Sequence, residues 1–187
     1  GWDGLNLAGL NDSGEVVVYW WAPGLNDWQT INMTESFEGP TFNGQLDAYV
    51  TPWGGLNIAG RTDDGDLVTY WWAPGMTEWE VANISDAASG PSIATGTEVV
   101  VSSDGGINIF GVDASNSLHM LRWTPADPTW RTSDVTSLVS GDPVAFPLGG
   151  ASGGSLMVMS MRSTMDSDTM VHYLFDVDNS TWFWQAA

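Results

Sequence analysis

A tryptophan pair that returns at a fixed spacing constrains this chain more than any other feature. Tyr19–Gly24 reads YWWAPG, and the same six letters return 51 residues later at Tyr70–Gly75. One further step of 51 reaches Arg122–Pro125, which keeps one Trp of the pair. A single Trp follows each of these segments, at Trp28, Trp79 and Trp130, and Trp182 continues the series. Self-similarity with a period near 50 residues is typical of supersecondary units stacked side by side.

The second copy of the repeat is complete, and it predicts four short strands. The expected strands are Leu46–Thr51, Leu56–Arg61, Leu67–Trp72 and Trp79–Ile84. They are rich in β-branched and aromatic residues, and turn residues such as Asp64-Gly65 separate them. No helical periodicity of useful length accompanies them. Four antiparallel strands in about 50 residues are typical of one propeller blade.

The other copies repeat this order, with one strand missing at the start. We expect Glu98–Ser102, Ile107–Val112, Leu118–Trp123 and Trp130–Val135 in the third copy, and Val144–Pro147, Ser155–Met161, Met170–Phe175 and Thr181–Trp184 in the fourth. Trp2–Asn6 aligns with Trp53–Asn57, which is a second strand. The chain is therefore predicted to be all-β, a single β-propeller domain or propeller fragment over residues 1–187. Its blades are expected at about 1–36, 44–87, 96–137 and 143–187, the first of them without its initial strand.

A closed ring needs complete blades, because an open blade leaves a sheet edge and apolar surface exposed. Three explanations of the missing strand remain open. The chain is a piece of a longer propeller, or a four-bladed ring with one short blade, or it closes by association with another copy. The first and third are favoured over the second.

The charge of the chain limits its partners. Four Arg and no Lys stand against 23 acidic residues, which gives a formal net charge of −19. Such a surface repels phosphate backbones and anionic lipid, so we expect no nucleic acid partner. No apolar run is long enough to span a membrane, and there is no Cys for a disulfide or a thiolate site. Solubility outside a cell is the simplest reason for this composition, and we expect an extracellular protein.

Repeated aromatic and amide residues are the candidate ligand-binding residues. Adjacent Trp in a strand point to opposite faces, so one of each pair packs between blades while the other approaches the rim. Asn within an apolar strand needs partners for its amide, from a neighbouring loop or from a ligand. Inter-blade packing is the structural alternative for all of these residues. The candidates are Trp20, Trp21, Trp71, Trp72, Trp123, Asn6, Asn57 and Asn108.

The order of elements resembles a family of propeller lectins. Leu46–Thr51, Gly55–Arg61, Asp64-Gly65, Leu67–Trp72 and Trp79–Ile84 follow the strand, Gly-apolar strand, Asp-Gly turn, aromatic strand and Trp strand of tectonin and tachylectin-like lectins and related bacterial propellers. The resemblance covers nearly the whole chain. It implies sugar pockets between adjacent blades, lined by aromatic and polar side chains.

Three classes of function follow, in decreasing order of support. The first is a non-enzymatic binding module for a glycan or glycoprotein, in which several sites gain strength through avidity. The second is a structural or assembly module, whose first blade is completed by another segment or by a second copy. The third is an enzyme. His119 and His172 occupy comparable strand positions that suit packing, and no Gly-x-Ser-x-Gly elbow is present, although a glycosidase-type pair of carboxylates stays open. We expect no enzyme.

Two further patterns have a structural and a functional interpretation. Asp63, Asp64 and Asp66 offer oxygen ligands for Ca²⁺, but turn formation alone explains the same residues, and we expect no cofactor. Asn32-Met33-Thr34 and Asn83-Ile84-Ser85 are glycosylation sequons 51 residues apart. Their spacing is also what duplication of the repeat produces.

Overall fold

The computed structural model describes residues 3–165 and 168–186, which form four antiparallel sheets and three single-turn helices. Trp2, which aligns with Trp53, lies outside the described residues. The first sheet contains β1 (Leu5–Leu10), β2 (Val16–Trp21) and β3 (Gln29–Asn32), and the second contains β4 (Leu46–Val50), β5 (Leu56–Arg61), β6 (Leu67–Trp72) and β7 (Glu80–Asn83). The third contains β8 (Thr95–Val101), β9 (Ile107–Val112), β10 (Leu118–Trp123) and β11 (Arg131–Asp134). The fourth contains β12 (Val144–Gly153), β13 (Leu156–Ser163), β14 (Met170–Asp176) and β15 (Thr181–Ala186). The all-β propeller prediction is confirmed, including a first sheet that lacks its initial strand.

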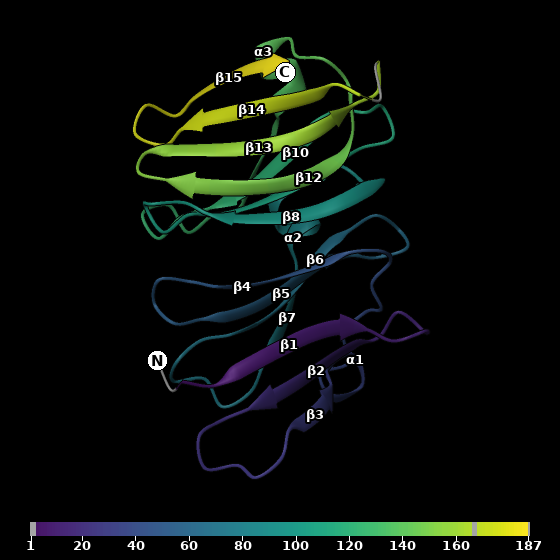
Figure 1. Ribbon diagram of the computed structural model, residues 1–187, viewed down its shortest axis with the longest axis vertical. Helices are drawn as coiled ribbons and strands as arrows, with labels where there is room; N and C mark the ends of the chain where they lie inside the picture. Colours follow the sequence, from purple (N-terminus) through teal and green to yellow (C-terminus); the bar gives the residue numbers. More distant parts are fainter. Residues whose placement is uncertain (1–2, 166–167, 187) are drawn as a thin grey trace.

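The sheets follow one another in chain order from the bottom to the top of Figure 1, with the first and the fourth at opposite ends. A hydrophobic cluster fills each of the three junctions between neighbouring sheets. Tyr70 is buried in the first junction, Ile109 in the second and Tyr173 in the third. Because the inner blades are covered on both faces, β9 is buried along its whole length, whereas β13 alternates between buried and half-buried residues.

Short glycine turns fix the hairpins of the blades. Gly65 has φ of +89°, in the left-handed region, and a side chain there would meet Ser92 Oγ at 2.1 Å and the Ile93 carbonyl at 2.8 Å. Only Gly fits both the backbone angle and this close approach of the loop that leads into the next blade. The Asp-Gly turn is therefore a requirement of the fold.

Three helices of one turn follow the last strand of the first three blades, where no helical periodicity predicts them. They are α1 (Met33–Ser36), α2 (Ile84–Ala88) and α3 (Val135–Val139). Each is capped at its N-terminus by the side chain of the preceding residue, which is Asn32, Asn83 or Asp134. The predicted strand Trp79–Ile84 accordingly ends one residue early, because Asn83 turns the chain into a helix.

The two sequons coincide with these caps. Asn32 Nδ2 donates to Glu15 and Asn83 Nδ2 donates to Asp66, so both amide nitrogens are engaged within the protein. The hydroxyls of Thr34 and Ser85 accept backbone N–H bonds from the neighbouring strand. Asp134 fills the same position in the third copy, where only capping requires an oxygen. Duplication of a structural motif thus explains the spacing of the sequons.

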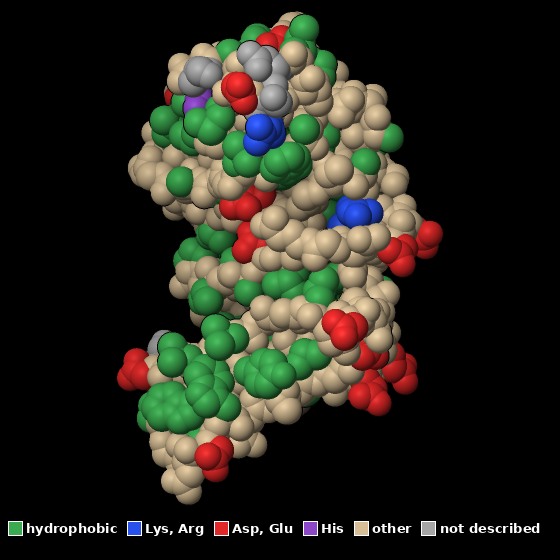
Figure 2. Space-filling model, turned by 45° about the vertical axis from the view of Figure 1, so that its right-hand side comes forward, with side chains coloured by type: hydrophobic (Ala, Val, Ile, Leu, Met, Phe, Trp, Pro, Cys, Tyr) green, Lys and Arg blue, Asp and Glu red, His purple; other side chains and the backbone are tan. Residues whose placement is uncertain are grey.

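Among the described residues, no helix is long and apolar enough to cross a membrane. Large hydrophobic side chains are exposed at both ends of the molecule. On the face seen in Figure 2, they include a group over the lower half, where the first two sheets lie. The large exposed members from these sheets are Leu5, Leu7, Tyr19, Trp28, Val50 and Trp53.

Candidate functional site

A cavity lies at each junction between neighbouring sheets, and equivalent repeat positions line all three. The first and second cavities each measure about 300 Å³, and the third about 420 Å³. The same position is Trp20 in the first cavity, Trp71 in the second and Arg122 in the third. The three cavities therefore share one arrangement of strands but differ in the side chains that line them.

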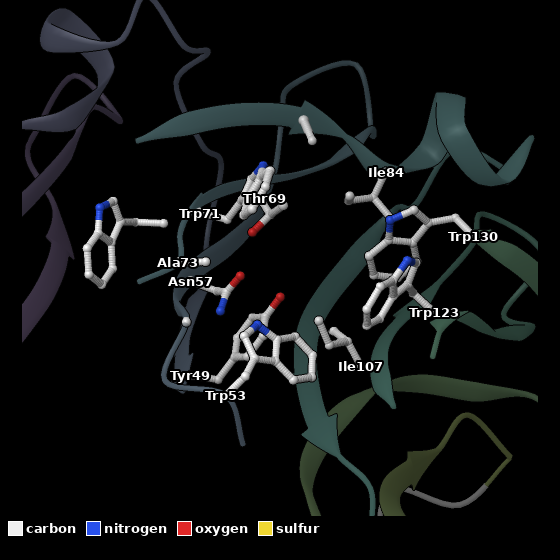
Figure 3. Close-up of a pocket in the computed structure, with 13 residues that line it drawn as sticks. Tyr49, Trp53, Asn57, Thr69, Trp71, Ala73, Ile84, Ile107, Trp123 and Trp130 are labelled. Carbon is white, nitrogen blue, oxygen red and sulfur yellow. The ribbon is translucent and has the colours of Figure 1, made fainter. Parts of the chain in front are cut away.

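The second junction is an aromatic cavity (Figure 3). Trp71 and Trp53 line it from the second sheet, and Trp123 and Trp130 line it from the third. The rings of Trp53 and Trp123 lie 5.6 Å apart at an interplanar angle of 58°. Strand register explains the placement of Trp71, since it pairs directly with Asn57 across β6 and β5. Burial raises the pKa of Tyr49, another residue of this wall, so its hydroxyl stays neutral.

Asn57 is the polar group of this cavity. Its side chain is 7% exposed, and its Nδ2 is buried without a hydrogen-bond partner among the described residues. Figure 3 shows the amide pointing into the space between Trp71 and Trp53. A buried amide without a partner costs about 1–3 kcal/mol, so a bound group that accepts its hydrogen bond would recover this free energy. The cavity thus combines apolar walls with one unsatisfied donor.

The third junction satisfies the equivalent amide internally. Asn108 Nδ2 donates to the Val100 carbonyl at 2.9 Å and to Ser102 Oγ at 3.1 Å, and Arg122 Nη1 donates to Asn108 Oδ1. Arg122 also pairs with Asp104, and its guanidinium lies 5.4 Å from the centre of the Phe175 ring. The Arg side chain that replaces Trp71 therefore completes a polar network.

The charge of Arg122 also acts on Asp104. Burial alone would raise the pKa of this carboxyl, but hydrogen bonds from Ser102 Oγ and Gly106 N together with the Arg122 charge hold the pKa below its usual range. A second ion pair joins Arg131 and Asp127 at 2.8 Å, on the exposed side of the cavity. The third cavity is thus charged where the second is apolar.

The first junction resembles the second but is more open. Trp20 and Asn6 line it from the first sheet, and Trp72 and Trp79 line it from the second. Asn6 is exposed, unlike Asn57 and Asn108. Trp21 lies on the opposite face of β2 from Trp20, and its Nε1 donates to the Leu25 carbonyl at 3.1 Å. Trp72 Nε1 makes the same bond, to the Met76 carbonyl, while its ring lines both the first and the second cavity.

The structure brings together some candidates and adds others. Trp71, Trp72, Trp123 and Asn57 share the second cavity, as the inter-blade interpretation requires. The single Trp that follows each aromatic segment suits inter-blade packing, and Trp79, Trp130 and Trp182 pack against the core clusters while each also lines a junction cavity. Trp28, the first of this series, is instead 46% exposed. Trp53 is a lining residue that was not among the sequence candidates. The repeat spacing could have predicted these lining residues, because equivalent positions in successive blades line equivalent cavities.

The carboxylates of the acidic turn in the second blade do not converge on one point. No group of three His, Cys, Asp or Glu side chains that could hold a metal ion is found among the residues described. Asp63 accepts from Asn43 Nδ2 at 2.6 Å, and Asp66 accepts from Asn83 Nδ2 at 2.9 Å. Asp64 is exposed at the tip of the turn. These contacts fit a role in holding the loops of the turn.

The two His residues lie in separate blades, each with its own partner. His119 Nε2 lies 2.9 Å from Asp113 Oδ2, and His172 Nδ1 lies 3.0 Å from Ser160 Oγ. The aromatic cavity contains neither of them.

Comparison with known proteins supports the fold. No protein-family model and no curated protein matches the sequence. The structure is similar to AofleA from Arthrobotrys oligospora, with a TM-score of 0.65 and 12% identity over 99% of this chain and 53% of that one. It is similar to the six-bladed fucose-recognising lectin of Aleuria aurantia, with a TM-score of 0.62 and 13% identity over 97% of this chain and 55% of that one. It also resembles the SapL1 lectin in complex with alpha methyl fucoside, with a TM-score of 0.63 and 13% identity over 98% and 60% of the two chains.

These similarities confirm the propeller fold, and the tectonin and tachylectin part of the sequence resemblance stays a prediction. The chain spans little more than half the length of the propellers it resembles.

Proposed function

We propose that this chain is a non-enzymatic carbohydrate-binding module and that the aromatic cavity between the second and third sheets is its principal sugar site. The observation that carries the proposal is the unpartnered, buried amide of Asn57 inside a wall of indole rings. Sugars carry both the apolar C–H faces that stack on Trp and the oxygens that accept a hydrogen bond. A cavity with these two features and neutral side chains suits a neutral sugar residue better than a charged one.

The similarity to propeller lectins supports the same class of ligand. Two of the solved structures are described by their recognition of fucose or by a bound fucoside. A neutral monosaccharide is therefore the first ligand to test on this chain. Because three junctions repeat one architecture, weak binding at one site is strengthened when a multivalent glycan engages more than one.

A second candidate function is assembly, and the first sheet favours it. Sheets two to four each have four strands, whereas the described first sheet has three and leaves the inner edge of β1 unpaired. An added strand, from another segment of polypeptide or from a second copy, would complete that blade by main-chain hydrogen bonds. Sugar binding and assembly are compatible, since the second cavity does not involve β1.

The sugar proposal is tested by a glycan array followed by calorimetric titration of the strongest ligand. We expect Trp71→Ala and Trp123→Ala to weaken binding by at least about fivefold, since stacking of one aromatic ring contributes of the order of 1 kcal/mol or more. Trp28→Ala is the matched control, because Trp28 is 46% exposed and lies outside this cavity. Equal affinity of all four proteins, or no binding of any glycan by the wild type, would contradict the proposal.

A further inference from the structure

Side-chain carboxylates join the innermost strands of neighbouring blades. Asp47 Oδ2, on β4, accepts the backbone N–H of Val99 on β8 at 2.6 Å. Glu98 Oε1, on β8, accepts the backbone N–H of Gly150 on β12 at 3.0 Å. Each bond joins residues 52 apart in the chain, so it belongs to the repeat. An ionised acceptor makes these bonds stronger than ordinary hydrogen bonds between neutral groups.

Strand register identifies where the next bond of this series would form. The two acids pair across their sheets with Ala59 and Phe110. The equivalent residue of the first sheet is Ala8 on β1, and the equivalent N–H donor on the second sheet is Ala48, which pairs with Ile58. An acidic residue opposite Ala8 would therefore occupy the same repeat position as Asp47 and Glu98. Its carboxylate could accept a hydrogen bond from the second sheet, as theirs do from the third and fourth. The described first sheet contains no strand on that side of β1.

The space for such a strand exists beside β1. A groove of about 460 Å³ is lined by both Ala8 and Ala48, and also by Leu5 and Val50. Leu5 is 57% exposed and Val50 is 61% exposed, although both belong to regular strands. Leu5-Asn6-Leu7-Ala8-Gly9 also differs by one residue from Leu56-Asn57-Ile58-Ala59-Gly60, the segment of β5 that β4 pairs with. The edge of β1 thus presents nearly the same surface that β5 offers to β4.

The innermost strands of a second copy, β4, β8 and β12, do not supply the missing carboxylate. In any copy, β4 and β8 already pair within their own sheets, and their acids are engaged there. The innermost strand of the fourth blade, β12, has Gly149 opposite Ser160, at the register position of Glu98 opposite Phe110. The series of carboxylate bonds therefore ends at β12, because Gly149 has no side chain that could accept a hydrogen bond from a further blade.

We propose that the groove beside β1 binds an extended peptide segment, distinct from the strands described here, that carries an Asp or Glu opposite Ala8. Its backbone pairs with β1, and its carboxylate accepts the Ala48 N–H. The inference rests on the proposed completion of the first blade and is independent of sugar binding. The occupant is thus defined by its register against β1 and by one negative charge, in the way that Asp47 on β4 contacts Val99 on β8.

A peptide titration tests the inference directly. The probe is a fluorescent ten-residue peptide that copies residues 43–52, and its partner peptide replaces the residue corresponding to Asp47 by Asn. Binding to the full chain is followed by fluorescence anisotropy at neutral pH and about 0.15 M salt, which screens the net negative charge of the protein. We expect saturable binding of the Asp peptide and about tenfold weaker binding of the Asn peptide, as expected for one charge-assisted hydrogen bond.

Variants of the protein provide a second measurement. Ala48→Pro removes the N–H donor on an edge strand, where Pro is tolerated when that N–H faces away from the sheet. Ala48→Ser is the matched control, since it keeps the donor. We expect Ala48→Pro to abolish the preference for the Asp peptide and Ala48→Ser to retain it. Equal binding of the two peptides by the wild type would overturn the role of the carboxylate, and binding of neither would overturn strand addition to β1. In either case, the calorimetric titration with sugar is unaffected.

Discussion

The second and third junctions are built from equivalent strands and differ in the side chains that line them. Trp53 and Trp71 at the second junction correspond to Asp104 and Arg122 at the third. At the second, Trp71 lies beside an unpartnered Asn57 in an aromatic cavity. At the third, Arg122 occupies the position of Trp71, and Asn108 is fully engaged. The amide is 7% exposed in one junction and 0% in the other, so burial does not distinguish them. What differs is whether the protein supplies the hydrogen-bond partners itself or leaves a donor for a ligand.

This difference shows how a repeat protein separates stability from recognition. A position whose hydrogen bonds are all made within the protein stabilises the junction, whereas a position with an unmet hydrogen bond costs stability and creates a site. The same Asn is thus structural in one blade and a candidate contact in another.

The largest expected effect is on folding stability, from matched substitutions of the two amides. Asn108→Leu removes hydrogen bonds to Val100, Ser102 and Arg122 and leaves buried groups unpaired, so we expect a loss of about 2–3 kcal/mol in the free energy of unfolding. Asn57→Leu removes an amide whose nitrogen has no partner, and we expect a change of less than about 1 kcal/mol. Urea denaturation of both variants measures the difference, and equal losses would show that the two junctions do not differ in this way.

Removal of the cation is expected to have the next largest effect. Arg122→Ala leaves Asp104 and Asn108 without their shared partner, and we expect about 2 kcal/mol of destabilisation. Arg122→Lys keeps the charge but not the forked geometry, and it should recover only part of the loss. The same denaturation series provides the measurement. A stability of Arg122→Ala equal to that of the wild type would mean that the polar network contributes nothing to the fold.

Two carboxyl groups, Asp104 and Asp47, should respond to acid with opposite sign. The folded pKa of Asp104 lies below its usual value, so its stabilisation is complete above about pH 3.9 and is lost as the pH falls through the folded pKa. Burial raises the folded pKa of Asp47, so protonation of that group favours the folded state, and its contribution to stability increases as the pH falls through the folded value.

Denaturation midpoints between pH 7 and pH 3 check these signs. At neutral pH, Asp104→Asn should be less stable than the wild type, and this difference in the free energy of unfolding should shrink as the pH falls. For Asp47→Asn, the free energy of unfolding relative to that of the wild type should instead decrease as the pH falls. Parallel pH profiles for the wild type and both variants would contradict the assignment.

The smallest expected effect concerns the helix caps beside the two junctions, Asn83 before α2 and Asp134 before α3. Asp134→Asn should keep the cap on Ser137 N and change the free energy of unfolding by a few tenths of a kcal/mol, whereas Asp134→Ala should cost about 1 kcal/mol. Thermal denaturation distinguishes the two. If Asn and Ala destabilise equally, capping is not the reason for the repeated Asn or Asp at this position.

The repeat spacing was sufficient to predict the blades. Leu56–Arg61, Leu67–Trp72, Ile107–Val112 and Leu118–Trp123 match the observed strands residue for residue, because both faces of these central strands are buried and their apolar runs end at turn residues. The helices were missed because four or five residues give no periodicity. They form through a cap and through burial of Met33, Ile84 and Val135.

The site was predicted less completely than the fold. Adjacent aromatic pairs indicated Trp71, Trp72 and Trp123, but pairing partners such as Trp53 and Trp130 come from segments that only the three-dimensional structure brings together. The unmet hydrogen bond of Asn57 is likewise invisible in the sequence, since Asn57 and Asn108 occupy the same repeat position. The sequence hints at the difference at two equivalent positions, where Trp53 and Trp71 of the second copy correspond to Asp104 and Arg122 of the third.

Calorimetric titration of one neutral glycan against two variants tests the central claim most directly. The account predicts that Trp71→Ala weakens binding by at least about fivefold, while Arg122→Ala, despite its lower stability, binds with nearly the wild-type affinity at a temperature where it is folded. Loss of binding in Arg122→Ala together with unchanged binding in Trp71→Ala would contradict it, and would move the principal sugar site to the charged junction.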